Sequence, residues 1–271
     1  MLFTPKNKLH IFSRKIAPLF LSLALLLPGT AFGELRNLPS VTVLAASSLT
    51  DALTELIGIY AREKGITVSA SYDSSSVMAL QIIEGESADI FISAHPVWMT
   101  ELKQRGLIDV FTLTNLAKNR LVVAASTKNK LDTLLLQGKP VKTILKAITT
   151  RTIPVIADPA DVPLGMYTKE TLVALGMWKK LENNAIRTSS ARHALYLIAK
   201  GQSVGITYLT DAIGNPEVTI LAPIDDSLHS PIVYQAAVVA GENMQQARDF
   251  LDFLKSDKAI KVFEKYHFIM N

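Results

Sequence analysis

The stretch VTVLAASSLTDAL, residues 41–53, decides the fold of this chain, because it joins a strand to a helix through a run of small residues. Val41 and Val43 are typical of a short buried strand, and the apolar residues that follow the turn recur at helical spacing. Ser48 stands three residues before Asp51, which is the spacing of a capping box. The stretch therefore predicts a strand, a tight turn and a helix N-terminus, whose first amide hydrogens lack helical partners and attract anions.

The alternation of strands and helices continues along the chain. ADIFISA (88–94), LVVAAS (121–126) and VGITY (204–208) predict further buried strands, and amphipathic helices separate them. This order predicts an α/β protein with mainly parallel sheets and helices on both faces. The polar, lysine-rich region around 128–142 follows one of these strands, and we expect the chain to enter a second domain near there.

The first 33 residues have the features of a secretion signal. Four basic residues and no acidic one precede an apolar run over 16–27, and Ala31 and Gly33 supply a small-x-small cleavage pattern. The run is shorter than the ~20 apolar residues that span a bilayer. We therefore expect a cleaved signal peptide and a periplasmic mature protein, with an uncleaved N-terminal anchor as the alternative.

Removal of this segment changes the charge of the chain. The formal charge of +4, less the 4 basic residues of the segment, leaves the mature chain neutral. Nucleic acid and anionic membrane surfaces therefore lose their electrostatic attraction as partners. The chain contains no cysteine, which excludes disulfides, thiolate metal sites and a lipid-modified cysteine.

Small residues stand at four predicted helix starts, two in each half of the chain. They occur in AASSL (45–49), YDSSSVMAL (72–80), ADPADVPLGMY (157–167) and RTSSARHAL (187–195). Serine before a helix is the commonest cap, so each start alone has an ordinary structural explanation. Because open α/β sheets bind ligands beyond the carboxyl ends of their strands, the four together favour a ligand-binding cleft between two lobes.

The chemistry of this cleft favours an anion. The hydroxyls of Ser48 and Ser75 and the helix amides form a cage of donors without a full positive charge. Such a cage suits a fully ionised oxyanion, whereas a protonated phosphate would need an acceptor for its hydrogen. Asp73 and Asp158 could supply one, but we interpret Asp73 as a turn residue and Asp158 as the residue that fixes a bend. Tyr208, at a strand end, could donate its hydroxyl into the cleft.

An enzyme is the less favoured reading. The sequence has no G-x-S-x-G elbow, no H-E-x-x-H zinc motif and no phosphate-cradling glycine loop. The histidines outside the leader are far apart, without metal-ligand spacing, and we assign them surface or structural roles: His95, His193, His229 and His267.

Together these motifs resemble the periplasmic molybdate-binding proteins of ABC transporters, over nearly the whole mature chain. AASSLTDAL, SYDSSSVMALQI, ADIFISAHPVWM, DPADVPLGMYTKE and GITYLTDA are each similar to a motif of that family. Two positions depart from its pattern: Leu164 replaces a small alanine, and His95 stands where aspartate is usual. A position that acts through its backbone amide tolerates Leu164, and we expect His95 to change a hinge-side or surface contact.

The resemblance implies a type II periplasmic-binding-protein fold, in which the chain crosses twice between two α/β lobes. The implied lobes are 34–119 plus 225–271, and 120–224. It also implies a monomeric receptor that binds molybdate, without a cofactor and without enzymatic activity. The implied partners are a membrane permease and its cytoplasmic ATPase. The implied ligands of molybdate, and of tungstate, are Ser48, Ser75, Leu164, Ala191 and Tyr208.

Three alternatives stay open at this stage. The first is a receptor for sulfate, phosphate or another tetrahedral oxyanion, which a cage of serines and amides also suits. The second is a secreted enzyme with Ser48 or Ser75 as nucleophile, which would need a base within reach. The third is a ferric-iron receptor that uses Tyr208 and Tyr72 as paired ligands, although Tyr72 fits a strand position better.

Overall fold

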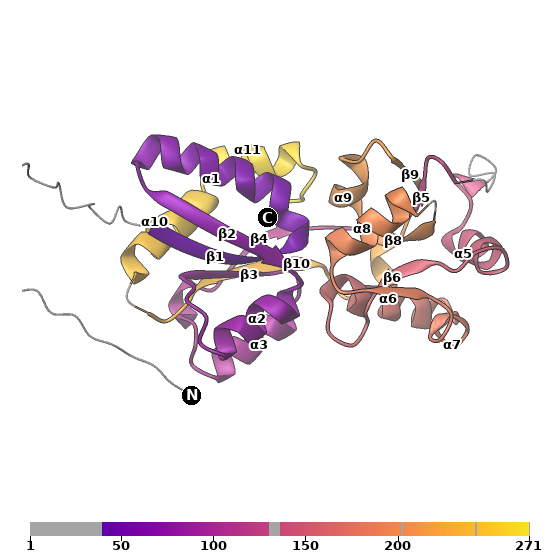
Figure 1. The fold of residues 1–271 in the computed structure, drawn as a ribbon, viewed down its shortest axis with the longest axis horizontal. Coiled ribbons are helices and arrows are strands. Elements are labelled where there is room, and N and C mark those ends of the chain that lie inside the picture. The colour runs from indigo at the N-terminus through magenta and orange to yellow at the C-terminus, as the bar shows by residue number, and fades with distance from the viewer. Residues whose placement is uncertain (1–39, 130–135, 202, 242, 271) are drawn as a thin grey trace, which may run out of the picture. The chain divides into compact units, whose positions relative to one another are not determined.

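The computed structural model describes residues 40–129, 136–201, 203–241 and 243–270. The predicted signal peptide and its cleavage site lie outside these residues. Within them, ten strands form two five-stranded sheets, each accompanied by helices (Figure 1). None of the helices in these ranges is long and apolar enough to cross a membrane.

The first sheet carries the strand that opens the described chain. Its order is β2 (Thr67–Asp73), β1 (Ser40–Ala46), β3 (Ile90–Ser93), β10 (Val233–Val238) and β4 (Thr114–Lys118). β1 pairs in parallel with β2 and β3, whereas β10 runs antiparallel to β3 and β4.

The second sheet repeats this plan with the middle part of the chain. Its order is β7 (Ile186–Thr188), β6 (Val155–Ala157), β8 (Val204–Tyr208), β5 (Leu121–Ser126) and β9 (Val218–Pro223). β6 pairs in parallel with β7 and β8, and β5 runs antiparallel to β8 and β9.

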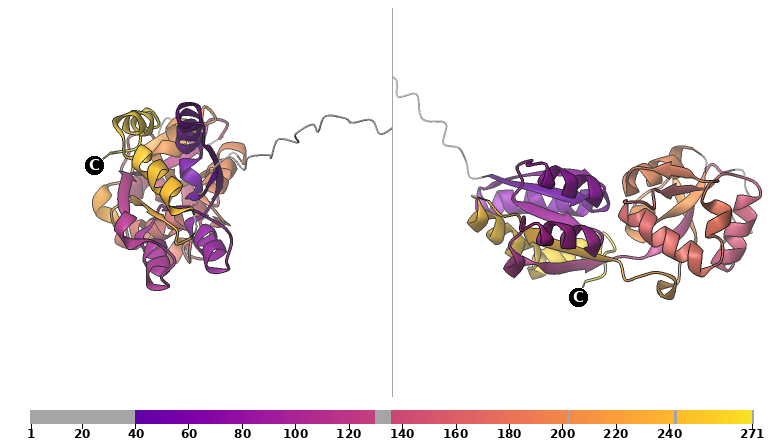
Figure 2. Two further views of the ribbon diagram at one scale, coloured as in Figure 1. Left: turned by 90° about the vertical axis from the view of Figure 1, so that its left-hand side faces the viewer. Right: turned by 90° about the horizontal axis from the view of Figure 1, so that it is seen from below.

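The prediction of mainly parallel sheets is therefore only half correct. The chain passes from the first sheet to the second between β4 and β5, and returns between β9 and β10 (Figures 1 and 2). β5 and β10 are the strands that follow these passages, and each is antiparallel to both of its neighbours. The parallel pairs are those joined by helical crossovers, as the alternating pattern requires.

Helices follow most of the strands in chain order. They are α1 (Thr50–Lys64), α2 (Ser75–Ile83), α3 (Pro96–Gln104), α5 (Val141–Thr149), α6 (Pro163–Ala174), α7 (Trp178–Leu181), α8 (Ala191–Lys200), α9 (Leu209–Ile213), α10 (Met244–Leu254) and α11 (Asp257–Lys265). Short 3-10 helices cover Ser47–Leu49, Val110–Thr112 and Asp226–Leu228. α1 ends at Gly65, whose φ of 66° is the left-handed conformation that glycine adopts without strain.

Side chains of the first sheet alternate between two apolar layers. Val43 and Ile90 belong to the core that also contains Phe250 of α10, whereas Leu44 and Phe91 belong to the core beneath α2 and α3. Successive residues of a strand point to opposite faces, so both faces of these strands are covered by helices. This burial fixes the ends of β1 and β3, from which the loops to α1 and α3 begin.

Candidate functional site

Four helix starts meet at one small pocket, whose cavity volume is about 10 Å³. The pocket is lined by Ala46, Ser47, Ser48, Asp73, Ser74, Ser75, Ala94, Val162, Pro163, Leu164, Ala191 and Tyr208. The structure therefore brings together all five residues implied as ligands, from both sheets. Of the other seven, the sequence singled out only Asp73, as a turn residue, and the rest are immediate neighbours of the helix starts and of the end of β3.

Ser48 lies in the 3-10 helix that leads into α1, and its side chain is buried. Its hydroxyl lies 2.7 Å from the hydroxyl of Tyr234 on β10. The predicted capping box with Asp51 is wrong, because α1 begins after Leu49 and no side chain caps it. The 3-10 turn moves the true helix start beyond Ser48, which leaves the serine hydroxyl free for a tertiary contact.

Ser75 is the first residue of α2, and Ser74 caps this helix by accepting a hydrogen bond from the backbone N–H of Val77 at 3.3 Å. The Oγ of Ser75 accepts a hydrogen bond of 2.9 Å from the backbone N–H of Ala94. This bond uses an acceptor site of Ser75, so the serine's own proton is available to a further acceptor in the pocket.

The other two helix starts come from the second sheet. α6 begins at Pro163, so Leu164 is its second residue, and the Leu164 side chain is fully buried away from solvent. α8 begins at Ala191, and Ser190 caps it by accepting from the backbone N–H of His193 at 3.2 Å. The first backbone N–H groups of a helix have no partner within it, so both starts can donate to a pocket ligand.

Tyr208 ends β8 and is 1% exposed. Its hydroxyl has no hydrogen-bond partner among the described residues, although buried hydroxyls usually have one. Burial raises the pKa of Tyr208 well above its usual value, so the hydroxyl keeps its proton at neutral pH. The group is a buried donor at the edge of the pocket.

The pocket lining contains one charged residue, Asp73, and no basic one. The Oδ1 of Asp73 accepts from the backbone N–H of Ser74 at 2.7 Å, which is the turn role expected from the sequence. Asp158 is outside the lining; its Oδ1 accepts from the backbone N–H of Ala160 at 3.0 Å and lies 3.4 Å from Arg187. The bend role predicted for Asp158 agrees with these contacts.

Polar contacts join the elements of the two sheets around the pocket. Trp98 on α3 donates its indole N–H to the carbonyl of Asp161 at 3.1 Å. Arg192 on α8 contacts Asp51 on α1 at 2.6 Å, and its Nε lies 3.1 Å from the buried carboxylate of Asp211. Burial raises the pKa of Asp211 to about 7, against the opposing effect of Arg192. The contacts of Trp98 with Asp161 and of Arg192 with Asp51 link elements of the two sheets, whereas the Arg192–Asp211 contact joins α8 and α9 of the second.

His95 has a structural role, as we expected for the histidines. His95 caps α3 by accepting from the backbone N–H of Val97 at 3.2 Å, and its ring lies 4.8 Å from that of Tyr167. Among the described residues, no group of three or more His, Asp or Glu side chains is arranged to hold a metal ion.

Sequence reasoning missed Tyr234 and Asn119. Asn119 donates to the Tyr234 hydroxyl at 3.1 Å, and Tyr234 contacts Ser48, so the two residues support the pocket from behind. Tyr234 lies in a stretch that predicts only a strand, and it stands 186 residues from Ser48. Nothing local in the sequence connects these residues.

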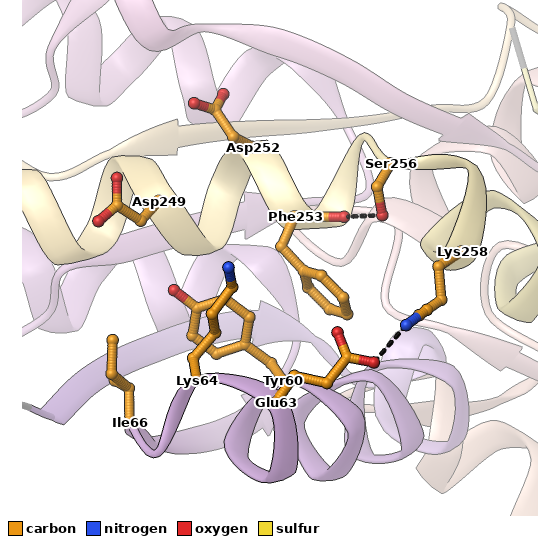
Figure 3. A pocket seen from close by; sticks show the side chains of 9 residues that line it. All are labelled: Tyr60, Glu63, Lys64, Ile66, Asp249, Asp252, Phe253, Ser256 and Lys258. Atoms are coloured by element: carbon orange, nitrogen blue, oxygen red, sulfur yellow. Dashed lines mark hydrogen bonds and ion pairs between the residues drawn. The ribbon is translucent and has the colours of Figure 1, made fainter.

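Another hollow among the described residues lacks the features of this pocket. This hollow, shown in Figure 3, lies between α1, α10 and α11, and its walls include Tyr60, Glu63 and Phe253. Glu63 is paired there with Lys258, and Ser256 donates to the carbonyl of Phe253 at 2.7 Å. Its charged side chains carry both signs, and none of the predicted ligands lies in it.

Known proteins resemble this chain along most of its length. The family model described as bacterial extracellular solute-binding protein matches residues 41–269. The molybdate-binding protein ModA of Haemophilus influenzae is 35% identical over 92% of this chain and 96% of its own. ModA of Escherichia coli is 34% identical over 94% of this chain and 98% of its own.

The fold has solved counterparts as well. The periplasmic molybdate-binding protein of Azotobacter vinelandii superposes with a TM-score of 0.75 at 23% identity, covering 85% of this chain and 99% of that one. This likeness confirms the predicted periplasmic-binding-protein fold. With two helix-flanked sheets, four helix starts at one pocket and a family model that spans residues 41–269, the chain belongs to the bacterial extracellular solute-binding proteins.

Proposed function

We propose that this protein is a periplasmic receptor that captures molybdate, and tungstate as well, and delivers it to an ABC permease driven by a cytoplasmic ATPase. In this proposal the first 33 residues are a cleaved signal peptide and the mature protein acts as a monomer, without catalytic activity. The two lobes are 34–119 plus 225–271, and 120–224, and the chain's passages at β4–β5 and β9–β10 form the hinge between them.

One observation carries the proposal: a pocket built from four helix starts is lined by the same five residues that the family motifs imply. We assign hydroxyl and amide donors to Ser48 and Ser75, backbone amide donors to Leu164 and Ala191, and a phenolic donor to Tyr208. Fixed dipoles of this kind stabilise an anion without a full positive charge. The relatives named for molybdate binding in Haemophilus influenzae and Escherichia coli support the same ligand.

The lack of a basic side chain in the lining suits a transport receptor. A buried salt bridge to the anion would be costly to break, since each separated charge loses its partner in a medium of low polarity. Neutral donors hold the anion through several hydrogen bonds, and these can be released together when the lobes part. We therefore propose that release follows lobe opening.

A receptor for another tetrahedral oxyanion, such as sulfate or phosphate, is the alternative, because the same donors suit it. Calorimetric titration of the protein from residue 34 onward with molybdate, tungstate, sulfate and phosphate distinguishes them. We expect one-to-one binding of molybdate, with sulfate at least about a hundredfold weaker, which corresponds to ~2.7 kcal/mol. Tight binding of sulfate or phosphate with no response to molybdate would establish the alternative.

A substitution at Tyr208 tests the assigned pocket. Tyr208→Phe removes a hydroxyl that has no partner among the described residues, so the unliganded fold loses no bond to them. We expect molybdate affinity to fall by about 5- to 150-fold, equivalent to ~1–3 kcal/mol for a bond to a charged group. Tyr60→Phe, in the hollow of Figure 3, is the matched control and should leave the affinity unchanged. Equal affinities for the two variants would remove Tyr208 from the site.

The ferric-iron alternative receives no support from the placement of the tyrosines. Tyr72 is outside the pocket lining, and its hydroxyl lies 3.2 Å from that of Thr54 on α1. Tyr208 is the one tyrosine in the lining, so the pair that this alternative requires does not meet there.

A further inference from the structure

The direction of one buried hydrogen bond determines what the pocket offers to a ligand. The hydroxyls of Ser48 and Tyr234 lie 2.7 Å apart, and both side chains are buried, at 3% and 0% exposure. Either oxygen can donate in such a pair. If Ser48 donates to Tyr234, its proton points away from the pocket; if Tyr234 donates to Ser48, the serine proton is left for the ligand.

Asn119 settles this direction. Its Oδ1 accepts a hydrogen bond of 2.8 Å from the backbone N–H of Arg120, and because that N–H can only donate, the oxygen end of the amide is identified. The Nδ2 end therefore donates, at 3.1 Å to the hydroxyl of Tyr234 and at 3.0 Å to the hydroxyl of Thr210.

Tyr234 then has to donate to Ser48. Its oxygen already accepts from Asn119, and Ser48 is the other polar partner that the described residues give this hydroxyl. The opposite arrangement would leave a buried phenolic proton without an acceptor, which is unfavourable. The bonds run in one direction, from Asn119 to Tyr234 to Ser48, and we call these three residues the relay.

Ser75 also accepts a hydrogen bond from the protein, but from a different partner. Its Oγ accepts from the backbone N–H of Ala94 at 2.9 Å, so its proton is likewise left for the pocket. Tyr208 adds a third hydroxyl without a partner among the described residues. The single carboxylate of the lining, Asp73, already accepts from Ser74 through Oδ1. The hydroxyls of Ser48, Ser75 and Tyr208 therefore present their protons to a ligand.

We infer that Asn119 and Tyr234 are positioning residues that turn the Ser48 proton toward the ligand and thereby select oxyanions without a proton of their own. This inference rests on the proposed function. Neither residue lines the pocket, so each acts through Ser48. An anion that carries an O–H group, such as inorganic phosphate near neutral pH, would meet a second donor at Ser48 instead of an acceptor.

A reversal of the relay provides the test. Asn119→Asp keeps the shape of the side chain but replaces the donor with an acceptor, so Tyr234 would donate to residue 119 and accept from Ser48. The Ser48 proton would then turn away from the pocket. We expect molybdate affinity, measured by calorimetric titration, to fall by about 100-fold or more, a loss of ~2.7 kcal/mol.

The added negative charge of Asn119→Asp could weaken binding by itself, so the change is repeated in a Tyr234→Phe background. Phenylalanine cannot transmit the reversal, whereas the charge acts in both backgrounds. We expect the cost of Asn119→Asp to drop below about tenfold there, which is the coupling that a double-mutant cycle measures. Equal costs in the two backgrounds, with the wild type binding molybdate, would overturn the relay and leave the proposed function intact.

Two further measurements complete the test. Titration with inorganic phosphate should show that Tyr234→Phe lowers the preference for molybdate over phosphate by at least tenfold, because a freed Ser48 hydroxyl can also accept; an unchanged ratio contradicts the inference. If urea unfolding shows that Asn119→Asp does not fold, the phosphate titration of Tyr234→Phe decides the inference alone. A wild type that binds none of molybdate, tungstate, sulfate and phosphate would overturn the relay and the proposed function together.

Discussion

Gly165 sits where the start of α6 touches the end of β6, and replacing it with alanine tests whether this contact sets the position of Leu164. A Cβ atom built at Gly165 would lie 2.2 Å from the carbonyl oxygen of Asp158 and 2.5 Å from that of Ala157. An ordinary contact is 3.4 Å or more, so the backbone would have to separate by about 1.2 Å, from 3.4 − 2.2. The opposing atoms are backbone, which cannot rotate aside as a side chain can.

The energetic cost follows from this geometry. Overpacking of a buried site costs ~1–3 kcal/mol, and the better helix propensity of alanine returns up to ~1 kcal/mol. We therefore expect Gly165→Ala to lower the free energy of unfolding by ~1–2 kcal/mol. A shift of about 1 Å in the start of α6 would also lengthen any hydrogen bond from the Leu164 amide beyond its useful range, so molybdate affinity should fall about tenfold or more.

Urea unfolding and calorimetric titration measure the two effects, and Gly58→Ala is the matched control. Gly58 lies within α1, and the one atom near its added Cβ is the end of the flexible Arg62 side chain at 3.4 Å. This control should stabilise the protein by up to ~1 kcal/mol and leave affinity unchanged. If Gly165→Ala is as stable as Gly58→Ala and binds molybdate within twofold of the wild type, the close approach of α6 to β6 does not position the site.

Two more predictions concern polar contacts around the pocket. Burial raises the pKa of Asp211 to about 7, so its contribution to the free energy of unfolding is present at acid pH and is lost as the pH rises toward 7. Urea unfolding from pH 4.5 to 7.5 should show that the difference in free energy of unfolding between the wild type and Asp211→Asn shrinks. A constant difference would contradict this. Trp98→Phe removes the 3.1 Å bond to the Asp161 carbonyl, and we expect molybdate to dissociate about 2- to 10-fold faster in stopped-flow measurements. Trp178→Phe on α7 should change nothing, and equal dissociation rates for the two variants would mean that the Trp98 bond does not help to retain the ligand.

Local sequence patterns predicted much of the framework of this protein. The bounds of β5 and β8 agree with the strands predicted at 121–126 and 204–208, because a short apolar run is recognised from neighbouring residues alone. The short strands β4 and β7 escaped prediction, since a few residues carry too little periodicity to be distinguished from a loop.

The family motifs also implied five residues that the structure brings to one pocket. Each implied position lies at a helix start or a strand end, where the geometry is set by residues close in sequence. The capping box predicted for Ser48 and Asp51 is wrong, because a capping box and a 3-10 turn compete for the same few residues and packing decides between them.

The tertiary structure alone decided which side chains meet across long separations. The sequence by itself determined the α/β class, the positions of most helix starts and the donor character of the residues there. It contained no sign that Tyr234 would lie behind Ser48 or that Arg192 would reach the buried Asp211. Such contacts depend on strand order and on the return of the chain as β10, which is set by the packing of the whole domain rather than by neighbouring residues.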